Sequence, residues 1–310
     1  MSPTTPITGR FAPSPTGALH TGSLVSAVGS WLMAKSAGGS WLLRIDDLDA
    51  PRQQPGMADD ILATLERFGL LWDCELTWQS RNRPAYEEAF QQLNRSGAIY
   101  PCHCSRKEIA QAASAPHAAD DCLPYPGSCR DITPHDKPIR SWRVRVTYEP
   151  ICFHDRRRGL TCQNLSTGCG DFAVRRGDGE FAYQLAVVLD DHLTGVNQVV
   201  RGDDLLNSTP RQIHLQRLLG LPQPEYCHLP LVSGPGGAKL SKRNNLVSHH
   251  LGNWSGQEGV LLHGVLLFLG LEPPQELRNA PCGEILAWGA AHFQVSNIPQ
   301  TGGELVPTPP

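Results

Sequence analysis

The chain has 310 residues, of which 40% are hydrophobic and 18% are charged, with a formal net charge of −3 and an isoelectric point near 6.4. This length is enough for one large domain or two small domains with a sizeable core. The charge balance excludes a globally basic nucleic-acid binder, so a nucleic-acid partner would need a local basic face. The candidates for such a face are Arg156, Arg157, Arg158, Arg175 and Arg176, although runs of charge are more often solvated loops.

Neither terminus nor interior suggests a targeting or membrane segment. Residues 1–10 contain no apolar stretch after a basic start, which a signal peptide would need. No apolar run is long enough to span a bilayer. We therefore expect a cytoplasmic protein.

Residues 1–100 alternate strand-like and helix-like segments. The expected elements are a strand at 7–12, a turn at 14–17, a helix at 19–37, a strand at 41–45 and a helix at 57–68. The two helices end at glycines, Gly38-Gly39 and Gly69, as helices commonly do. This alternation predicts an α/β fold with a parallel sheet.

Residues 101–180 have a different character and predict a mixed α+β insertion. Ser105 and Glu108 have the spacing of a capping box at a helix start. Residues 141–148 alternate between apolar and arginine side chains, which is typical of an antiparallel strand with one solvated face. Residues 172–183 predict a hairpin around Gly177-Asp178-Gly179.

The remaining residues are expected to complete the core and then end in helices. Residues 181–250 would form the second half of the core, with a strand at 198–201 and a helix beginning near Ser208. Residues 251–296 predict a helical C-terminal region. Residues 297–310 are rich in Pro and Gly, and we expect them to be disordered.

Some of the ten cysteines are spaced like metal ligands. Cys102 and Cys104 stand one residue apart, and Cys129 follows after a loop, so these three could hold a tetrahedral Zn²⁺ or could be reduced thiols without metal. Chemistry alone prefers a thiolate or an imidazole as fourth ligand, and His103, His117 and Cys122 lie nearby. The other cysteines (74, 152, 162, 169, 227 and 282) show no tight pairing, although Cys162 and Cys169 could serve a second site.

The segment RFAPSPTGALHTGS (residues 10–23) leads from a strand through a Pro/Gly turn into a helix. A helix N-terminus offers free N–H groups and a positive dipole end, which suit phosphates. Gly17 and Gly22 remove side chains where a nucleotide could approach, and His20 could donate to a phosphate oxygen. Taken alone, this pattern is also that of an ordinary capped helix with an incidental histidine.

A second motif, KLSKR (residues 239–243), follows the glycine-rich segment GPGG (234–237). Lysines on a glycine-hinged loop could neutralise a departing pyrophosphate. Taken alone, this motif is also that of an exposed basic loop.

In this order, the two motifs resemble the HIGH and KMSKS signatures of class I aminoacyl-tRNA synthetases. RFAPSPTG, LLRIDDLD (42–49), FAYQLA (181–186), VLDD (188–191) and VRGDD (200–204) further resemble the glutamyl-tRNA synthetase subgroup. The resemblance covers about residues 7–245. It implies a Rossmann-type catalytic domain and a ligase that uses ATP, with Mg²⁺, to activate L-glutamate.

The resemblance also implies roles for single residues. Arg10 would pair with the side-chain carboxylate of glutamate, and Asp46 would take its α-amino group, although the family usually has Glu at this position. Arg201 would help to complete the pocket, its alternative being a surface ion pair with Asp203 or Asp204. The other expected glutamate-binding residues are Phe11, Ala12, Pro13, Ser14 and Tyr183. ATP would be bound by His20, Gly22 and Lys242, and catalysis would depend on His20, Lys239 and Lys242.

The number of residues after the second motif indicates which relatives of glutamyl-tRNA synthetase the chain resembles. Only 67 residues follow Arg243, which is too few for a helical anticodon-binding domain. The chain therefore resembles the glutamyl-Q tRNA(Asp) synthetases, which activate glutamate without tRNA and transfer it to queuosine, the modified wobble base of tRNA(Asp). A tRNA(Glu)-charging enzyme and a non-catalytic tRNA or nucleotide binder are the alternatives.

This family has a structural zinc site of the pattern C-x-C…Y-x-x-x-C. By resemblance, its ligands here would be Cys102, Cys104, Tyr125 and Cys129, with Cys122 as the rival to Tyr125. We expect the enzyme to act as a monomer.

Overall fold

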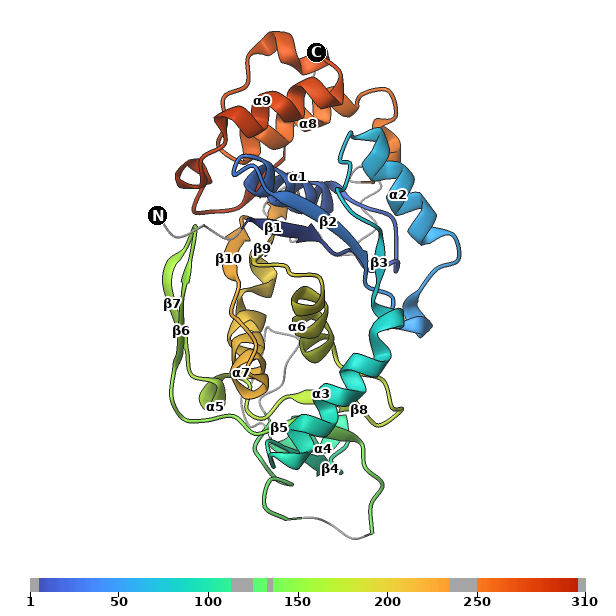
Figure 1. Ribbon diagram of the computed structural model, residues 1–310, viewed down its shortest axis with the longest axis vertical. Coiled ribbons are helices and arrows are strands. Elements are labelled where there is room, and N and C mark those ends of the chain that lie inside the picture. The colour runs from blue at the N-terminus through green and yellow to red at the C-terminus, as the bar shows by residue number, and fades with distance from the viewer. Residues whose placement is uncertain (1–5, 113–124, 133–135, 235–249, 306–310) are drawn as a thin grey trace.

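The computed structural model describes residues 6–112, 125–132, 136–234 and 250–305. In this part of the chain a seven-stranded sheet forms the centre of the molecule, and a three-stranded sheet lies at its lower end (Figure 1). The strands of the large sheet are β1 (Thr8–Phe11), β2 (Ser40–Ile45), β3 (Thr77–Trp78), β6 (Ile151–Asp155), β7 (Gly159–Gln163), β9 (Gln198–Gly202) and β10 (Glu225–Leu229). The small sheet contains β4 (Ile99–Cys102), β5 (Ser141–Val144) and β8 (Ala173–Arg176).

The large sheet has the order β3-β2-β1-β9-β10-β6-β7. All its neighbours pair in parallel except β6 and β7, which form an antiparallel hairpin. From β1 the chain moves outward to β2 and β3, whereas β9 and β10 extend the sheet on the other side of β1. The strand order therefore reverses between β1 and β9, and open α/β sheets bind ligands at the carboxyl ends of the strands at such a point. The predicted parallel α/β fold is confirmed.

Helices cover both faces of this sheet (Figure 1). The α-helices in the described residues are α1 (Thr21–Lys35), α2 (Met57–Arg67), α3 (Arg83–Arg95), α4 (Arg106–Ala112), α5 (Leu165–Gly168), α6 (Tyr183–Leu193), α7 (Thr209–Leu219), α8 (Glu258–Phe268) and α9 (Cys282–His292), of which α4 lies beside the small sheet. One apolar core joins α1, α2, α8 and α9 to the sheet, and a second joins α3, α6 and α7 to the opposite face and to the small sheet. The helix α1 packs very close to β10, because a Cβ atom at Gly29 would lie 2.5 Å from a methyl carbon of Leu229.

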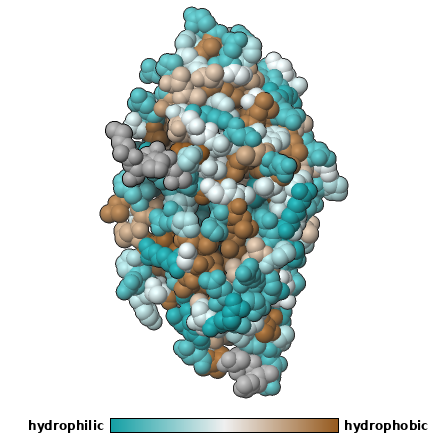
Figure 2. Space-filling model, viewed as in Figure 1, coloured by the Kyte–Doolittle hydropathy of each residue, from teal (hydrophilic) through white to brown (hydrophobic). Residues whose placement is uncertain are grey.

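Hydrophilic and apolar residues are unevenly distributed over the surface. On the face in Figure 2, hydrophilic residues cover much of both ends, whereas apolar residues gather near the centre. None of the helices in the described ranges is both long and apolar enough to cross a lipid bilayer.

Within residues 101–180, for which we predicted an α+β insertion, α4, β5 and β8 lie next to strand β4. The capping box at its helix is confirmed: the Ser105 N–H donates to the Glu108 carboxylate (2.7 Å), and the Glu108 N–H donates to the Ser105 hydroxyl (3.2 Å). The hairpin β6–β7 lies within residues 101–180 yet belongs to the large sheet, where Asp155 pairs with Tyr226 of β10. Ile151, Phe153 and Asp155 alternate inward and are buried, which fixes β6 at this edge.

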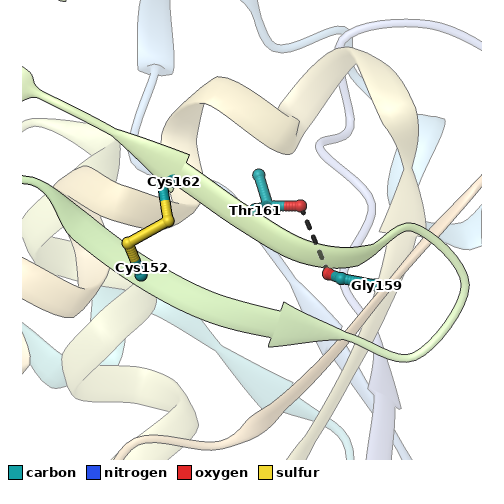
Figure 3. Close-up of a disulfide and its surroundings, with 4 residues drawn as sticks. All are labelled: Cys152, Gly159, Thr161 and Cys162. Carbon is teal, nitrogen blue, oxygen red and sulfur yellow. Dashed lines mark hydrogen bonds between the residues drawn. A yellow bond between two sulfur atoms is a disulfide. The ribbon is translucent and has the colours of Figure 1, made fainter.

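The same hairpin contains a disulfide between Cys152 and Cys162 (Figure 3). The expectation that these two cysteines show no pairing is wrong, and so is the suggestion that Cys162 shares a second metal site with Cys169. The reason is the hairpin register, which sets Cys152 directly opposite Cys162. The two cysteines are ten positions apart in the sequence, and this spacing alone does not reveal that they pair.

The C-terminal helices are confirmed, but the expected disorder from residue 297 is wrong for residues 297–305. Strand β12 (Gly303–Glu304) pairs with β11 (Val232–Ser233). Ile298 and Leu305 are buried in the core, and the Arg157 guanidinium donates to the carbonyls of Pro299 (3.0 Å) and Gln300 (2.9 Å). These long-range contacts outweigh the Pro- and Gly-rich composition. Residues 306–310 lie outside the described ranges.

Candidate active site

A cavity of about 450 Å³ opens at the point where the strand order reverses. Its walls come from the carboxyl end of β1, the segment that follows it, the start of α1, the end of β9 and the turn after β10. The structure places at this cavity every described residue that the sequence predicted for glutamate and ATP: Arg10, Phe11, Ala12, Pro13, Ser14, His20, Gly22, Asp46, Tyr183 and Arg201. Lys239 and Lys242 lie outside the described residues.

His20 is the N-cap residue of α1, and its ring lies in the cavity wall. Its Nδ1 accepts a hydrogen bond from the Ser23 N–H (3.2 Å), so a neutral ring has its proton on Nε2. Gly22 allows this placement, because a Cβ atom there would lie 3.1 Å from two atoms of the His20 ring. A Cβ atom at Gly17 would instead have no neighbour within 4 Å, which leaves space for a ligand. The arrangement places an imidazole and a helix N-terminus in the same wall of the cavity.

A buried cluster of charges forms the floor beside Arg10. The Asp191 carboxylate accepts from Arg10 Nε (3.1 Å) and from an Arg44 Nη nitrogen (2.7 Å). Arg44 Nε also donates to Asp46 (2.7 Å), and all four side chains are buried. The guanidiniums of Arg10 and Arg44 overcome the effect of burial and hold the pKa of Asp191 below its usual range.

Asp46 titrates differently from Asp191. Burial raises its pKa to about 6, and the neighbouring Arg44 only partly offsets this effect. A cation bound beside Asp46 would stabilise its carboxylate, as an opposite charge does for any buried acid. The cluster can therefore bind an ammonium group at Asp46 while Arg10 stays fixed by Asp191.

Arg201 extends from the end of β9 into the opposite wall of the cavity. It is not the surface ion pair considered as an alternative, because it is only 5% exposed. Its Nη2 donates to the Thr209 hydroxyl (2.7 Å) and its Nε donates to Nε2 of His228 (3.2 Å). Its Nη1 is buried and has no hydrogen-bond partner among the described residues. Tyr183, the first residue of α6, is 40% exposed and lines the same cavity.

The cysteine motif lies in the insertion, away from the cavity. The sulfur atoms of Cys102, Cys104 and Cys129 lie within 4.8 Å of one another. The Tyr125 hydroxyl lies 3.4 Å from the sulfur of Cys102 and 3.9 Å from that of Cys104. The nearby His103 instead contacts the Lys137 carbonyl through Nδ1 (2.6 Å). His117 and Cys122, the remaining alternatives, lie outside the described residues.

These distances fit a tetrahedral Zn²⁺ site, in which Zn–S bonds of about 2.3 Å separate the sulfur atoms by slightly less than 4 Å. The Arg143 guanidinium lies 3.9 Å above the centre of the Tyr125 ring. Burial opposes ionisation of Cys102, but hydrogen bonds from Tyr125 and Arg143 lower the pKa of its thiol. Burial raises the pKa of the Cys104 thiol to about 11 and also raises the pKa of the Tyr125 hydroxyl, so a bound cation would have to stabilise the anionic forms of these two ligands.

A second cleft, of about 620 Å³, lies beside the cysteine cluster between α4, residues 138–141 and β8. Arg106, Arg140, Arg143 and Arg176 line it together with a single acid, Asp178, which is paired with Arg176. Arg106 and Arg140 are exposed, and neither forms an ion pair with another described residue. The cleft is therefore a concentrated positive surface on a protein with a negative net charge.

The arginine runs proposed from the sequence have mainly structural roles. Arg157 is buried and bonds to backbone carbonyls of the C-terminal segment, and Arg158 pairs with Asp203. Arg156 pairs with Glu225 (3.4 Å), and Arg175 pairs with Glu87 (3.2 Å). Only Arg176 among them lies at the positive cleft.

Several residues of the site had no assigned role in the sequence. Arg44 and Asp191 stand inside the motifs LLRIDDLD and VLDD, and the signal available in the sequence was a charged residue that directly follows apolar residues or another acid in each motif. Asp155 and His228 had no such signal, because they meet only when β6 and β10 pair.

Comparison with known proteins agrees with this architecture. The family model described as tRNA synthetases class I (E and Q), catalytic domain, matches residues 6–279. A glutamyl-Q tRNA(Asp) synthetase of Geobacter sulfurreducens is 56% identical over 96% of this chain and 95% of that protein. One of Dechloromonas aromatica is 48% identical over 97% of this chain and 99% of that protein. Among solved structures, a glutamate tRNA ligase from Elizabethkingia meningosepticum in complex with its amino acid matches 97% of this chain and 67% of its own, with a TM-score of 0.80 and 25% identity.

Proposed function

This chain belongs to the glutamyl-Q tRNA(Asp) synthetase family, within the class I synthetases, and from that premise we propose that it activates L-glutamate with ATP and transfers it to queuosine at the wobble position of tRNA(Asp). The observation that supports this most strongly is the cavity at the strand-order reversal. It combines buried arginines, an acid of raised pKa and a helix N-terminus capped by an imidazole. Such a set of groups suits an amino acid beside a nucleotide.

In the proposed reaction the chain positions its substrates and stabilises charge. Arg10 and Arg201 bind carboxylate oxygens of glutamate, and Asp46 accepts from its ammonium group. The α-carboxylate then attacks the α-phosphate of ATP, the bond to pyrophosphate breaks, and glutamyl-adenylate forms. His20 donates from Nε2 to the phosphate oxygens that gain charge, with the lysines of the KLSKR motif in the same role. Bound Mg²⁺ would neutralise phosphate charge.

The second half-reaction needs the RNA to lie across the insertion. A hydroxyl of the queuosine ring would attack the activated carbonyl and release AMP. The arginine-lined cleft beside α4 has the charge and the guanidinium forks that suit a phosphate backbone. We propose that Arg106, Arg140 and Arg176 contact phosphates of the anticodon stem.

We also propose that Cys102, Cys104, Tyr125 and Cys129 bind one structural Zn²⁺. The short distances among their donor atoms support this ligand set. The site would stabilise the insertion, because it ties strand β4 to residues 125–129.

Glutamate-dependent exchange of labelled pyrophosphate into ATP, measured without tRNA, tests the first half-reaction. We expect exchange with glutamate and not with aspartate, and a loss of about two orders of magnitude in the His20→Ala variant. Exchange that requires tRNA(Glu) would favour a tRNA(Glu)-charging enzyme. No exchange with any tRNA would favour a non-catalytic binder.

A further inference from the structure

Arg201 belongs to a closed network of buried side chains behind the cavity wall. Its Nη2 donates to the Thr209 hydroxyl (2.7 Å), and its Nε donates to Nε2 of His228 (3.2 Å). The Thr209 hydroxyl itself lies 3.0 Å from the same His228 nitrogen. The three side chains therefore form a triangle in which two of the three guanidinium nitrogens are engaged by the protein.

This network determines the protonation of His228. A guanidinium can only donate hydrogen bonds, so Nε2 of His228 must accept and cannot hold a proton. The proton of the neutral ring then lies on Nδ1, which faces Oδ2 of Asp155 at 2.7 Å. Both side chains are completely buried. Burial and the nearby Arg201 lower the pKa of His228, in agreement with a neutral ring.

Asp155 is held in place by the backbone of the hairpin turn. Its Oδ1 accepts from the N–H groups of Arg157 (3.0 Å) and Arg158 (2.8 Å). Its Oδ2 accepts from the N–H of His228 (3.1 Å) as well as from its ring. A carboxylate that accepts from four N–H donors has little freedom to reorient, so it fixes the orientation of the imidazole.

We propose that Asp155 and His228 are positioning residues that hold the Arg201 guanidinium in the orientation in which it binds a carboxylate of the amino-acid substrate. This inference rests on the proposed function, since it assumes that the cavity binds glutamate. Neither Asp155 nor His228 lines the cavity, so both act through Arg201. A guanidinium that is oriented before binding loses less conformational freedom when the amino acid binds. The affinity for the amino acid therefore rises, whereas the affinity for ATP does not.

Two substitutions at His228 separate positioning from simple packing. The amide of His228→Gln reaches the Nε2 position and can still accept from Arg201, whereas the shorter amide of His228→Asn reaches only the Nδ1 position and still contacts Asp155. We expect His228→Asn to raise the KM for glutamate about tenfold, as the loss of one charge-assisted hydrogen bond would do. His228→Gln should recover most of this loss. The KM for ATP should change less than about twofold in both variants, because no ATP contact is altered.

The assay is tRNA-independent pyrophosphate exchange, with thermal unfolding of each variant in parallel. His214→Asn is the matched control: His214 is a buried histidine with one hydrogen bond, to the Arg145 carbonyl (2.8 Å), and it does not line the cavity. It should lower the melting temperature without changing the KM for glutamate. Asp155→Asn should raise that KM in the same direction as His228→Asn.

Equal KM values for glutamate in the wild type, His228→Asn and His228→Gln would overturn the inference while leaving the proposed function intact. A similar KM increase in His214→Asn would also overturn it, because the effect would then be one of general destabilisation. A wild-type protein without glutamate-dependent exchange would overturn the proposed function, and the inference with it.

Discussion

The raised pKa of Asp46 predicts a specific pH dependence of glutamate activation. Asp46 has a pKa of about 6 because it is buried, and we propose that only its ionised form accepts from the substrate ammonium group. The ratio kcat/KM for glutamate reports the free enzyme, so it should follow the ionised fraction of this carboxyl. As the pH falls through the raised pKa, the acid gains a proton and loses the charge that binds the substrate.

The size of the effect follows from the same pKa. A carboxyl with a pKa of about 6 is roughly nine-tenths ionised near pH 7 and roughly one-tenth ionised near pH 5, so kcat/KM should fall about tenfold between them. An ordinary aspartate, with a pKa of about 3.9, would give almost no change over this range. The assay is pyrophosphate exchange at limiting glutamate, without tRNA, in buffers of constant ionic strength.

The Asp46→Asn variant is the control for this prediction. It should have a low kcat/KM for glutamate at every pH and should lack the step near pH 6, because its amide does not titrate. A flat wild-type profile, or the same step in Asp46→Asn, would refute the assignment of Asp46 as the ammonium-binding group.

Three further predictions concern the other parts of the site. Gly22→Ala should lower kcat of exchange about tenfold with a smaller change in the KM for glutamate, because the new methyl would displace the ring of His20; unchanged kcat would contradict this. Cys129→Ser should lose bound zinc, measured by elemental analysis, and lower the melting temperature by several degrees; an unchanged metal content would exclude Cys129 as a ligand. Arg140→Gln should raise the KM for tRNA several-fold and reduce the salt dependence of RNA binding, without changing the rate of pyrophosphate exchange. The control is Arg156→Gln, on the β6–β7 hairpin, which should leave all of these values unchanged. Equal effects of the two variants would contradict a role for the positive cleft.

Local sequence patterns were sufficient for much of the fold and of the cavity. The strand, turn and helix over residues 8–35 follow from apolar spacing and from Pro and Gly, which act over a few residues. Because that segment also forms one wall of the cavity, its motif places Arg10 and His20 at the same site before any long-range contact is known.

Contacts between distant segments could not be predicted in the same way. Asp191 meets Arg44 across 147 residues, and Asp155 meets His228 across 73 residues. The hairpin β6–β7 alternates like any edge hairpin, and only its pairing with β10 assigns it to the large sheet. For the C-terminal segment, the Pro- and Gly-rich composition suggested disorder. Composition carries no information about which core Ile298 packs against, and the burial of that side chain stabilises the ordered segment.

The most direct test of the proposed function is transfer of radiolabelled glutamate to tRNA(Asp) that contains queuosine, with unmodified tRNA(Asp) and tRNA(Glu) as controls. We expect label on the queuosine-containing tRNA alone, and loss of that label when the modified base is removed. Label on the 3′ end of tRNA(Glu), or equal label on both forms of tRNA(Asp), would contradict it.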